Sequence, residues 1–476
     1  MTNKIQFGTD GWRGLLESEV NNQTIGSVAQ AFAEYLWHNI KSSPIKVAVG
    51  FDGRKSSQKF ARTFARVLSG NGITAYLSER IIATPIVSYY INMHKLNAGV
   101  MITASHNPPS YNGIKFKAQY GGPFFTEHTK EVEDFIGNSL VQADDEKINQ
   151  VEFRPDYYHH IEKLIDFKAI KNANLNILVD SMAGAGQQLI ENLLAKHSIP
   201  CKTIFKIAEK DFSGRLAEPI EKNLLPLREE LIKENKYSLG IATDGDADRL
   251  GVMLDDGRWL SAQKTILLLC DYLVNSKKIS GNIVKTSSVT DKLRTAFENT
   301  NRKVIDVQVG FKYICEKMLE EDVVFGCEES GGFAFKGHIP ERDGILSGLY
   351  FIEMLAKSGY NKLSDLLAAK EKQFGDIFYD RIDLEYHKAD RIEILPKLFA
   401  ESRSAISKYR VTKVSEYYSS RKIINGLKFY LEGDNRWLLL RSSETEPMIR
   451  IYAEGNSANE VTELLEFGID FFTSED

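Results

Sequence analysis

Ser105 offers a hydroxyl in a segment where neither a helix nor a strand continues easily (residues 103–115, TASHNPPSYNGIK). Pro108 and the proline after it remove backbone donors and push the residues before them toward extended geometry. The Asn-Gly pair at 112–113 favours a tight turn. The segment therefore predicts a rigid loop that presents a serine hydroxyl, although an isolated run of this kind is as typical of a polar surface turn.

Three aspartates, Asp244, Asp246 and Asp248, alternate along a second polar segment. In an extended or turning backbone their carboxylates can face one point, where all-oxygen ligands select a hard ion such as Mg²⁺, Mn²⁺ or Ca²⁺ rather than zinc. A calcium EF-hand opens with the same spacing, but it needs glycine at the sixth position and glutamate at the twelfth. This chain has Arg249 and Asp255 there. The segment predicts a hard-cation site, with a solvated acidic turn as the alternative.

A third polar loop, residues 441–450 (RSSETEPMIR), lies between two apolar runs that predict strands. It offers guanidinium groups, hydroxyls and backbone donors together. Arginine's planar fork pairs two anionic oxygens at once, so this composition suits a phosphate group. Taken alone, the loop would be interpreted more readily as a charged hairpin tip.

Together these loops resemble the signatures of the phosphoglucomutase/phosphomannomutase family, the α-D-phosphohexomutases, and the resemblance spans the whole chain. Residues 7–14 (FGTDGWRG) are similar to the family's N-terminal signature, and residues 326–332 (GCEESGG) to its sugar-binding loop. Residues 441–447 are similar to its phosphate-binding loop. The resemblance implies an α/β fold with three similar α/β domains, each a mixed sheet between helices, and a smaller C-terminal α+β domain around a central cleft.

The resemblance also implies roles for individual residues. Ser105 is expected to be the phosphoserine, with one Mg²⁺ per chain between its phosphoryl group and the three aspartates. Lys115 is expected to handle the proton of the accepting hydroxyl, with its pKa lowered by the metal and Arg13. The remaining expected catalytic groups are Arg249, which neutralises a phosphoryl oxygen, and His106. Substrate contacts are expected from Glu328, Ser330, Lys312, Arg441, Ser443, Glu444, Thr445 and Arg450.

The chain departs from the family pattern at two positions. Gly332 stands where the sugar-binding loop ends in histidine, which removes a possible sugar contact or proton-handling group. Glu444 stands where the phosphate-binding loop has a small residue, and it puts a negative charge beside an expected anion. We expect the Glu444 side chain to point outward and to leave its backbone N–H available.

The composition limits the classes of function. A chain of 476 residues is too long for one core, so several domains are expected. The net charge of −5 argues against nucleic-acid binding and leaves the attraction of sugar phosphates to local cations. Four cysteines without paired spacing predict neither zinc nor disulfides. We expect no signal peptide and no membrane span, and therefore a cytoplasmic location. No pattern indicates the oligomeric state.

A strand, a turn of small residues and an amphipathic helix recur along the chain. The units begin near residues 46, 176 and 282, and each predicts a buried strand followed by a helix whose N-terminus can bind an anion. They predict domains at 1–145, 146–256 and 257–372, which carry the phosphoserine, metal and sugar-binding loops in that order. A C-terminal phosphate-binding domain is expected at 373–476.

The function expected from these features is a phosphohexomutase, with hexose phosphates as its small-molecule partners. It would move a phosphoryl group between C1 and C6 through the phosphoserine and a sugar bisphosphate, which also serves as the activator. Residues 310–313 (GFKY) favour glucose phosphates. The alternatives are a sibling mutase for mannose, glucosamine or pentose phosphates, or a catalytically silent sugar-phosphate-binding protein. A phosphatase is a weaker alternative, because a closed site excludes water.

Overall fold

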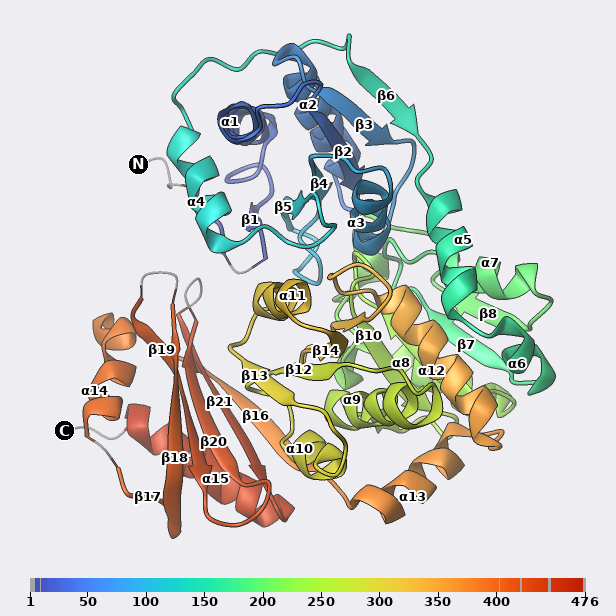
Figure 1. Cartoon of the computed structure of the whole chain (residues 1–476), viewed down its shortest axis with the longest axis vertical. Helices are drawn as coiled ribbons and strands as arrows, with labels where there is room; N and C mark the ends of the chain where they lie inside the picture. The colour runs from blue at the N-terminus through green and yellow to red at the C-terminus, as the bar shows by residue number, and fades with distance from the viewer. Residues whose placement is uncertain (1–4, 9, 402, 420–421, 444–446, 474–476) are drawn as a thin grey trace.

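The structure is a computed structural model that describes residues 5–8, 10–401, 403–419, 422–443 and 447–473. Four sheets follow one another along the chain, and each forms the centre of one domain (Figure 1). The predicted fold class is confirmed: three similar α/β domains precede a C-terminal α+β domain. The predicted domain limits stay a prediction.

The first sheet has the order β1-β5-β4-β2-β3-β6. Its central strands pair in parallel, and β5 turns back antiparallel beside β4. The parallel strands β2 and β4 are buried along almost their whole length, as expected for strands that helices cover on both faces. The strands are β1 (Trp12–Leu15), β2 (Lys46–Phe51), β3 (Thr74–Ser78), β4 (Ala98–Ile102), β5 (Tyr111–Ala118) and β6 (Ile148–Val151), and the helices are α1 (Asn22–Asn39), α2 (Ser57–Gly70), α3 (Thr84–Met93) and α4 (Thr126–Phe135).

The second and third sheets repeat this plan with fewer strands, in the orders β11-β10-β9-β7-β8 and β13-β12-β14-β15. The predicted strand–helix units are present in all three domains, as β2 and α2, β7 and α7, and β12 and α10. The strands are β7 (Ile177–Asp180), β8 (Cys201–Ile204), β9 (Leu239–Thr243), β10 (Leu250–Leu254), β11 (Trp259–Leu260), β12 (Asn282–Thr286), β13 (Val304–Val307), β14 (Val323–Cys327) and β15 (Phe333–Phe335). The α-helices are α5 (Arg154–Leu164), α6 (Phe167–Asn172), α7 (Leu189–Lys196), α8 (Leu225–Glu234), α9 (Ala262–Asp271), α10 (Lys292–Phe297), α11 (Phe311–Glu320), α12 (Gly344–Ser358) and α13 (Leu363–Phe374).

The fourth sheet is antiparallel throughout, in the order β16-β21-β20-β19-β18-β17. Its long strands lie apart from the other three sheets, beside α10 and β13 (Figure 1). The strands are β16 (Phe378–Glu385), β17 (Ala405–Ile406), β18 (Tyr409–Tyr418), β19 (Ile424–Leu431), β20 (Trp437–Ser442) and β21 (Met448–Gly455), with helices α14 (Ile394–Ala400) and α15 (Ala458–Thr473).

The apolar cores show how the domains are joined. One continuous core runs from α3 of the first domain through the second and third domains. The fourth domain has a separate core between its sheet and α14 and α15. Apolar packing therefore unites the first three domains, whereas other contacts must position the fourth. No helix among the described residues has the length and apolar composition that crossing a membrane requires.

Candidate active site where four domains meet

A cavity of about 710 Å³ lies between the domains and receives residues from all four of them. Several of the predicted site residues line it: Arg13, His106, Arg249, Glu328, Ser330, Arg441, Ser443 and Arg450. Ser105, Lys115 and the three aspartates are buried behind this lining, each with at most 1% of its surface exposed. The predicted residues from the first, second, third and fourth domains thus meet around one space, with Lys312 as the exception among the described ones.

The Ser105 hydroxyl lies in the loop between β4 and β5, as the prolines predict. The residue adopts a positive φ of 52°, which is uncommon for a residue with a side chain. Its backbone N–H donates to Thr103 Oγ1 at 2.8 Å, and its Oγ donates to Asp244 Oδ2 at 2.9 Å. Nδ1 of His106 lies 3.4 Å from the same Oγ. The hydroxyl is therefore held directly against the metal loop.

The metal loop is the tight connection between the antiparallel strands β9 and β10. One carboxylate oxygen from each of Asp244, Asp246 and Asp248 falls within 4.8 Å of the others. Asp244 Oδ1 accepts hydrogen bonds from the N–H groups of Asp248 and Arg249, which folds the loop around it. A side chain at Gly245 would put its Cβ 2.4 Å from the Ser105 carbonyl oxygen, so only glycine allows the two loops to approach this closely.

The three aspartates fit a hard divalent cation. Among the described residues, Asp246 Oδ1 and Asp248 Oδ1 are buried without a hydrogen-bond partner. Burial, together with the charges of Asp248 and Asp246, raises the pKa of Asp244 well above its usual value. Buried carboxylates with free oxygens are costly unless a cation coordinates them, and an all-oxygen set suits Mg²⁺. The predicted metal-binding character of this loop therefore agrees with its geometry.

The ammonium group of Lys115 lies among carboxylates from two domains. Its Nζ is 2.8 Å from Asp246 Oδ2, 2.8 Å from Asp248 Oδ2 and 3.1 Å from Asp10 Oδ2. Burial alone lowers the pKa of Lys115, but the three carboxylates outweigh burial and raise the pKa above its usual value. The lowered pKa that was expected for Lys115 is thus absent in this arrangement. The reason is the surplus of negative charge around Lys115, which the sequence did not reveal.

Arg342 and Asp10 are charged residues of the site to which the sequence analysis gave no role. Arg342 Nη2 lies 2.5 Å from Asp10 Oδ2 and 2.7 Å from Asp248 Oδ2, and its Nη1 is 3.6 Å from Glu328 Oε2. It therefore ties the third domain to the first domain and to the metal loop. Asp10 belongs to the N-terminal signature that was noted. Arg342 stands in a charged run just before the apolar helix α12, which is the one local signal of it.

The structure gives a physical reason for Gly332. A Cβ at this position would lie 2.4 Å from Cδ of Arg342 and 3.3 Å from Glu328 Oε2. The Arg342 side chain thus crosses the space that a residue larger than glycine would need. Glycine at position 332 therefore leaves room for Arg342 beside Glu328.

Arg13 and Arg249 line the cavity on the side of the serine loop. Arg13 Nη1 donates to Asn107 Oδ1 at 2.6 Å, and Arg249 Nη1 lies 3.8 Å from a carboxylate oxygen of Glu218. Burial and then the charges of Arg249 and Arg13 lower the pKa of His106 well below its usual value. These surroundings favour a neutral imidazole next to Ser105, among the positive charges of Arg249, Arg13 and Lys115.

Two of the three sugar contacts predicted in the third domain reach the cavity. Glu328 is buried, and burial raises its pKa against the opposing charges of Arg342 and Arg249. Ser330 Oγ is buried without a hydrogen-bond partner among the described residues. The expectation that Lys312 contacts the substrate is corrected by the structure. Its Nζ donates to Thr126 Oγ1 at the start of α4, and Lys312 is not among the described residues that line the cavity. It follows Gly310 and Phe311, which do line it, but α11 turns its side chain toward the first domain.

The fourth domain presents a pair of arginines to the cavity. Arg441 on β20 and Arg450 on β21 are directly opposite one another in the antiparallel register, so both side chains leave the same face of the sheet. Like charges placed opposite destabilise a sheet, and Asp383 on β16, whose Oδ1 lies 3.8 Å from Arg450 Nε, offsets part of this repulsion. Arg381 on β16 also lines the cavity and pairs with Glu329 of the third domain at 2.7 Å; the sequence analysis missed it. Glu444 and Thr445 lie outside the described residues.

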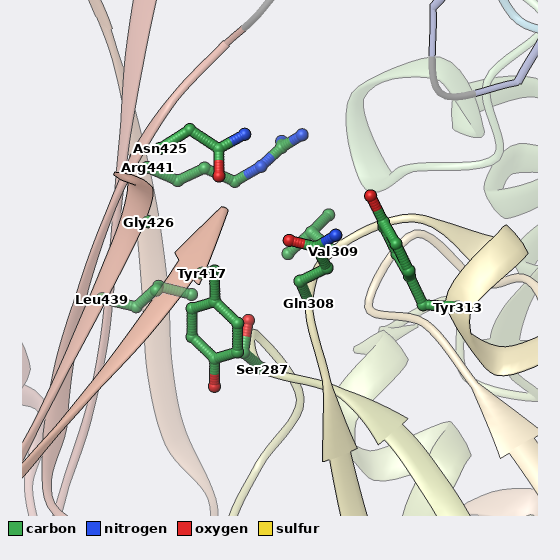
Figure 2. A pocket seen from close by; sticks show the side chains of 9 residues that line it. All are labelled: Ser287, Gln308, Val309, Tyr313, Tyr417, Asn425, Gly426, Leu439 and Arg441. Atoms are coloured by element: carbon green, nitrogen blue, oxygen red, sulfur yellow. The ribbon is translucent and has the colours of Figure 1, made fainter. Parts of the chain in front are cut away.

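A small hollow of about 10 Å³ marks the seam between the third and fourth domains (Figure 2). In Figure 2, Arg441 and Asn425 extend from the fourth-domain strands toward Gln308 and Val309 of the third domain. Arg441 lines both this hollow and the large cavity. Its position therefore depends on how the fourth domain is placed against the third.

Comparisons with known proteins agree with this arrangement. Sequence profiles of the phosphoglucomutase/phosphomannomutase family match in order: alpha/beta/alpha domain I at residues 4–141, domain II at 155–257, domain III at 261–374 and the C-terminal domain at 387–469. A phosphoglucomutase/phosphomannomutase of Thermococcus kodakarensis is 30% identical over 97% of both chains. A phosphoglucosamine/phosphogalactosamine mutase of Sulfurisphaera tokodaii is 29% identical over 96% of this chain and 97% of its own. The crystal structure of a putative phosphomannomutase from Thermus thermophilus has a TM-score of 0.84 at 31% identity and covers 99% of each chain.

Proposed function

The chain belongs to the phosphoglucomutase/phosphomannomutase family of phosphomutases, and from this membership we propose that it interconverts glucose 1-phosphate and glucose 6-phosphate. In this proposal a phosphoryl group passes from Ser105 to the free hydroxyl of the substrate, and the resulting sugar bisphosphate turns around and returns its other phosphoryl group to Ser105. The enzyme is thus an intramolecular phosphotransferase, and glucose 1,6-bisphosphate is its activator.

The observation that carries the proposal is the meeting of a serine hydroxyl, three buried carboxylates and a distant arginine pair around one cavity. Ser105 Oγ lies 2.9 Å from Asp244 on one side, and Arg441 and Arg450 line the same cavity from the fourth domain. Phosphoryl transfer depends on alignment and charge stabilisation more than on covalent activation. This arrangement supplies both.

Ser105 and its neighbours hold the phosphoryl group that is transferred. A phosphoserine carries about −1.5 to −2 charges near neutral pH, and beside three aspartates it needs positive charge. We propose that Asp244, Asp246 and Asp248 hold one Mg²⁺, which when bound neutralises phosphoryl oxygens and draws the aspartate charge away from Lys115. Arg13 and Arg249, which line the cavity next to Ser105, pair with the remaining phosphoryl oxygens.

Lys115 and His106 are the proposed proton-handling groups. Lys115 Nζ lies 2.8 Å from two of the metal-loop carboxylates, and His106 Nδ1 lies 3.4 Å from Ser105 Oγ. Lys115 is assigned to the accepting sugar hydroxyl. Neutral His106 hydrogen-bonds the serine oxygen when the phosphoryl group leaves it. Of the two, His106 lies beside the serine oxygen itself, whereas Lys115 contacts the carboxylates of the metal loop.

The other end of the substrate needs a site that accepts a phosphate in both orientations. Arg441, Arg450 and Ser443 supply it in this proposal, together with Glu444 and Thr445, which lie outside the described residues. The sugar between the two ends is held by Glu328 and Ser330, whose buried oxygens suit ring hydroxyls. Contacts of this kind tolerate the reversal, because they bind hydroxyls near the middle of the ring.

The test is turnover of glucose 1-phosphate in a coupled assay after priming with glucose 1,6-bisphosphate. Ser105→Ala should lose turnover and fail to gain the 80 Da of a phosphoryl group by intact mass spectrometry, while its circular dichroism stays unchanged. Ser110→Ala makes the same chemical change at an exposed position of the same loop and should keep full activity. Full activity in Ser105→Ala would refute the nucleophile, and a phosphorylated wild type without turnover of any hexose phosphate would refute the mutase.

A sibling substrate is the second candidate. The name of the Sulfurisphaera relative, a phosphoglucosamine/phosphogalactosamine mutase, keeps amino-sugar phosphates in consideration. The residues that contact the 2-hydroxyl or 2-amino group of the sugar decide which sugar phosphate is preferred. Comparing kcat/KM for glucose, mannose, glucosamine and pentose phosphates measures this preference. A higher kcat/KM for glucosamine 1-phosphate would replace glucose as the substrate and leave the mutase chemistry intact.

A further inference from the structure

Arg54 makes an unusual set of hydrogen bonds to the loop that carries Ser105. Its Nη2 donates to the carbonyl oxygens of Ser105 and Asn107, both at 2.6 Å. Its Nη1 donates to the carbonyl oxygens of Pro108 at 2.8 Å and Tyr111 at 3.1 Å. One guanidinium group therefore binds four backbone carbonyls of the same loop. It does so from a buried position, since Arg54 is only 3% exposed.

Asp52 anchors Arg54 and the other side of the loop together. Its Oδ2 lies 3.2 Å from Arg54 Nε and accepts the hydroxyl of Thr103 at 2.7 Å. Thr103 Oγ1 in turn accepts the backbone N–H of Ser105 at 2.8 Å. The N–H of Ser105 is thus bound through Thr103 and its carbonyl through Arg54, and both routes end on one carboxylate.

The loop has backbone hydrogen bonds of its own, from the N–H of Asn107 to the Ala104 carbonyl and from the N–H of Tyr111 to the Pro108 carbonyl, both at 3.0 Å, but neither binds the backbone of Ser105. Ser105 has a positive φ of 52°, a conformation that persists only when the surroundings enforce it. The two prolines at 108–109 have no N–H to donate. The ring of Phe212, from the second domain, covers the guanidinium at 4.7 Å and keeps water from competing for the carbonyls. Arg54 is therefore well placed to enforce the backbone geometry of Ser105.

We propose that Arg54 is a positioning residue for phosphoryl transfer, which fixes the backbone of the serine loop so that Ser105 Oγ stays aimed at the metal loop. This inference rests on the proposed function, because it assigns Ser105 the transfer. Arg54 touches neither the substrate nor the hydroxyl; it acts through the carbonyls. Its planar fork is essential, because a lysine ammonium cannot reach four carbonyls in one plane.

Arg215 provides a matched control in the second domain. It also forms a largely buried ion pair, with Nη2 2.6 Å from Asp180 Oδ1, and it also stacks on an aromatic ring, with its guanidinium 4.2 Å from the centre of Phe205. Its Nη1 donates to the carbonyl oxygen of Asn223 at 3.2 Å, away from the serine loop. Arg215→Lys therefore removes an ion pair and a ring contact comparable to those of Arg54, but it leaves the serine loop unchanged.

The experiment compares Arg54→Lys and Arg54→Met with Arg215→Lys in the full chain. We expect Arg54→Met to lower kcat by about 100-fold, because a displacement of Ser105 Oγ by about 1 Å has an effect of this size. Arg54→Lys should keep part of the activity that Arg54→Met loses. KM for glucose 1-phosphate should change little, because the third and fourth domains set it. Arg215→Lys should keep kcat within about threefold of wild type, although its melting temperature falls as much as that of Arg54→Lys.

Hydrogen–deuterium exchange provides a readout that does not depend on activity. The amides of residues 103–113 should exchange faster in Arg54→Lys and unchanged in Arg215→Lys. Unchanged exchange in this loop, or a kcat for Arg54→Lys equal to that of Arg215→Lys, would overturn the inference. If Arg54→Met does not fold, the comparison of Arg54→Lys with Arg215→Lys is sufficient to test the inference. A wild type that turns over no hexose phosphate would refute the proposed function, while the exchange of the loop would still decide whether Arg54 fixes it.

Discussion

Lys428 leads to a quantitative prediction about the seam between the third and fourth domains. It lies on β19, is fully buried, and donates to the carbonyl oxygen of Ser287 at 2.9 Å. Its Nζ is also 3.2 Å from Asp291 Oδ2 and 4.0 Å from the ring centre of Trp437. Burial, and then the neighbouring charge of Lys285, lowers the pKa of Lys428 from 10.5 to about 8, against the opposing carboxylates.

The sign of the effect follows from proton binding. Between pH 8 and 10.5 the unfolded chain keeps the Lys428 proton while the folded chain releases it, so folding becomes more favourable as the pH rises. A difference of 2.5 pKa units corresponds to about 3 kcal/mol in total, of which about 2 kcal/mol is gained between pH 8 and pH 10. The contribution is present above the pKa of the unfolded chain and is lost as the pH falls through the folded pKa.

The assay measures the free energy of unfolding of wild type and Lys428→Met between pH 8 and 10. Other titrating groups contribute to both proteins and cancel in the difference. Wild type should gain about 2 kcal/mol relative to the variant over this interval. Lys413→Met, at an exposed position of β18, should show no such change. Parallel curves for wild type and Lys428→Met would refute the lowered pKa, and so would a pKa near 10.5 for this residue measured by ¹³C NMR.

Three further substitutions test the cavity. Asp246→Asn should weaken Mg²⁺ binding by more than about 100-fold in isothermal titration calorimetry, because it removes charge and a free buried oxygen; unchanged affinity would exclude the loop as the metal site. Gly332→Ala should lower the free energy of unfolding by about 1–3 kcal/mol and reduce kcat/KM, because its Cβ meets Arg342 at 2.4 Å; wild-type values for both would show that Arg342 moves freely. Arg441→Met should raise KM for the sugar phosphate by about 10- to 100-fold with a smaller effect on kcat, since a charge-assisted hydrogen bond is lost; an effect on kcat alone would contradict phosphate binding there.

The sequence was sufficient where the chemistry is local. The aspartates of the metal loop are two residues apart in one tight turn, so their convergence within 4.8 Å needed no knowledge of the rest of the fold. The strand–turn–helix units were visible for the same reason, because apolar periodicity is a property of a short segment. The family resemblance then extended these local patterns to four domains. The domain limits and the roles of the site residues stay predictions.

The partners of each charge could not be predicted from the sequence. Lys115 was expected to have a lowered pKa, but Asp10 approaches it from a segment about a hundred residues earlier and Asp248 from a different domain. Arg342 is 332 residues from Asp10 along the chain, and no local pattern indicates that they meet. For Lys312 the opposite happened, because a predicted contact is absent. The family pattern placed this residue at the sugar, but the geometry of the helix turns its side chain toward Thr126.

The way in which the domains are joined explains how such distant groups come to share one cavity. At the seam of the first and third domains, Lys117 and Glu341 form a fully buried ion pair beside Arg342. The fourth domain, whose apolar core is separate, meets the third through Lys428 and Glu454, which accepts the N–H of Asp291 at 2.9 Å. Buried charges of this kind add little net stability, but a wrong placement leaves them unpaired at a cost of several kcal/mol, about 3–5 in known cases. We infer that they set where each domain lies, and therefore the distance from the serine loop to the arginine pair, while the apolar cores provide most of the stability.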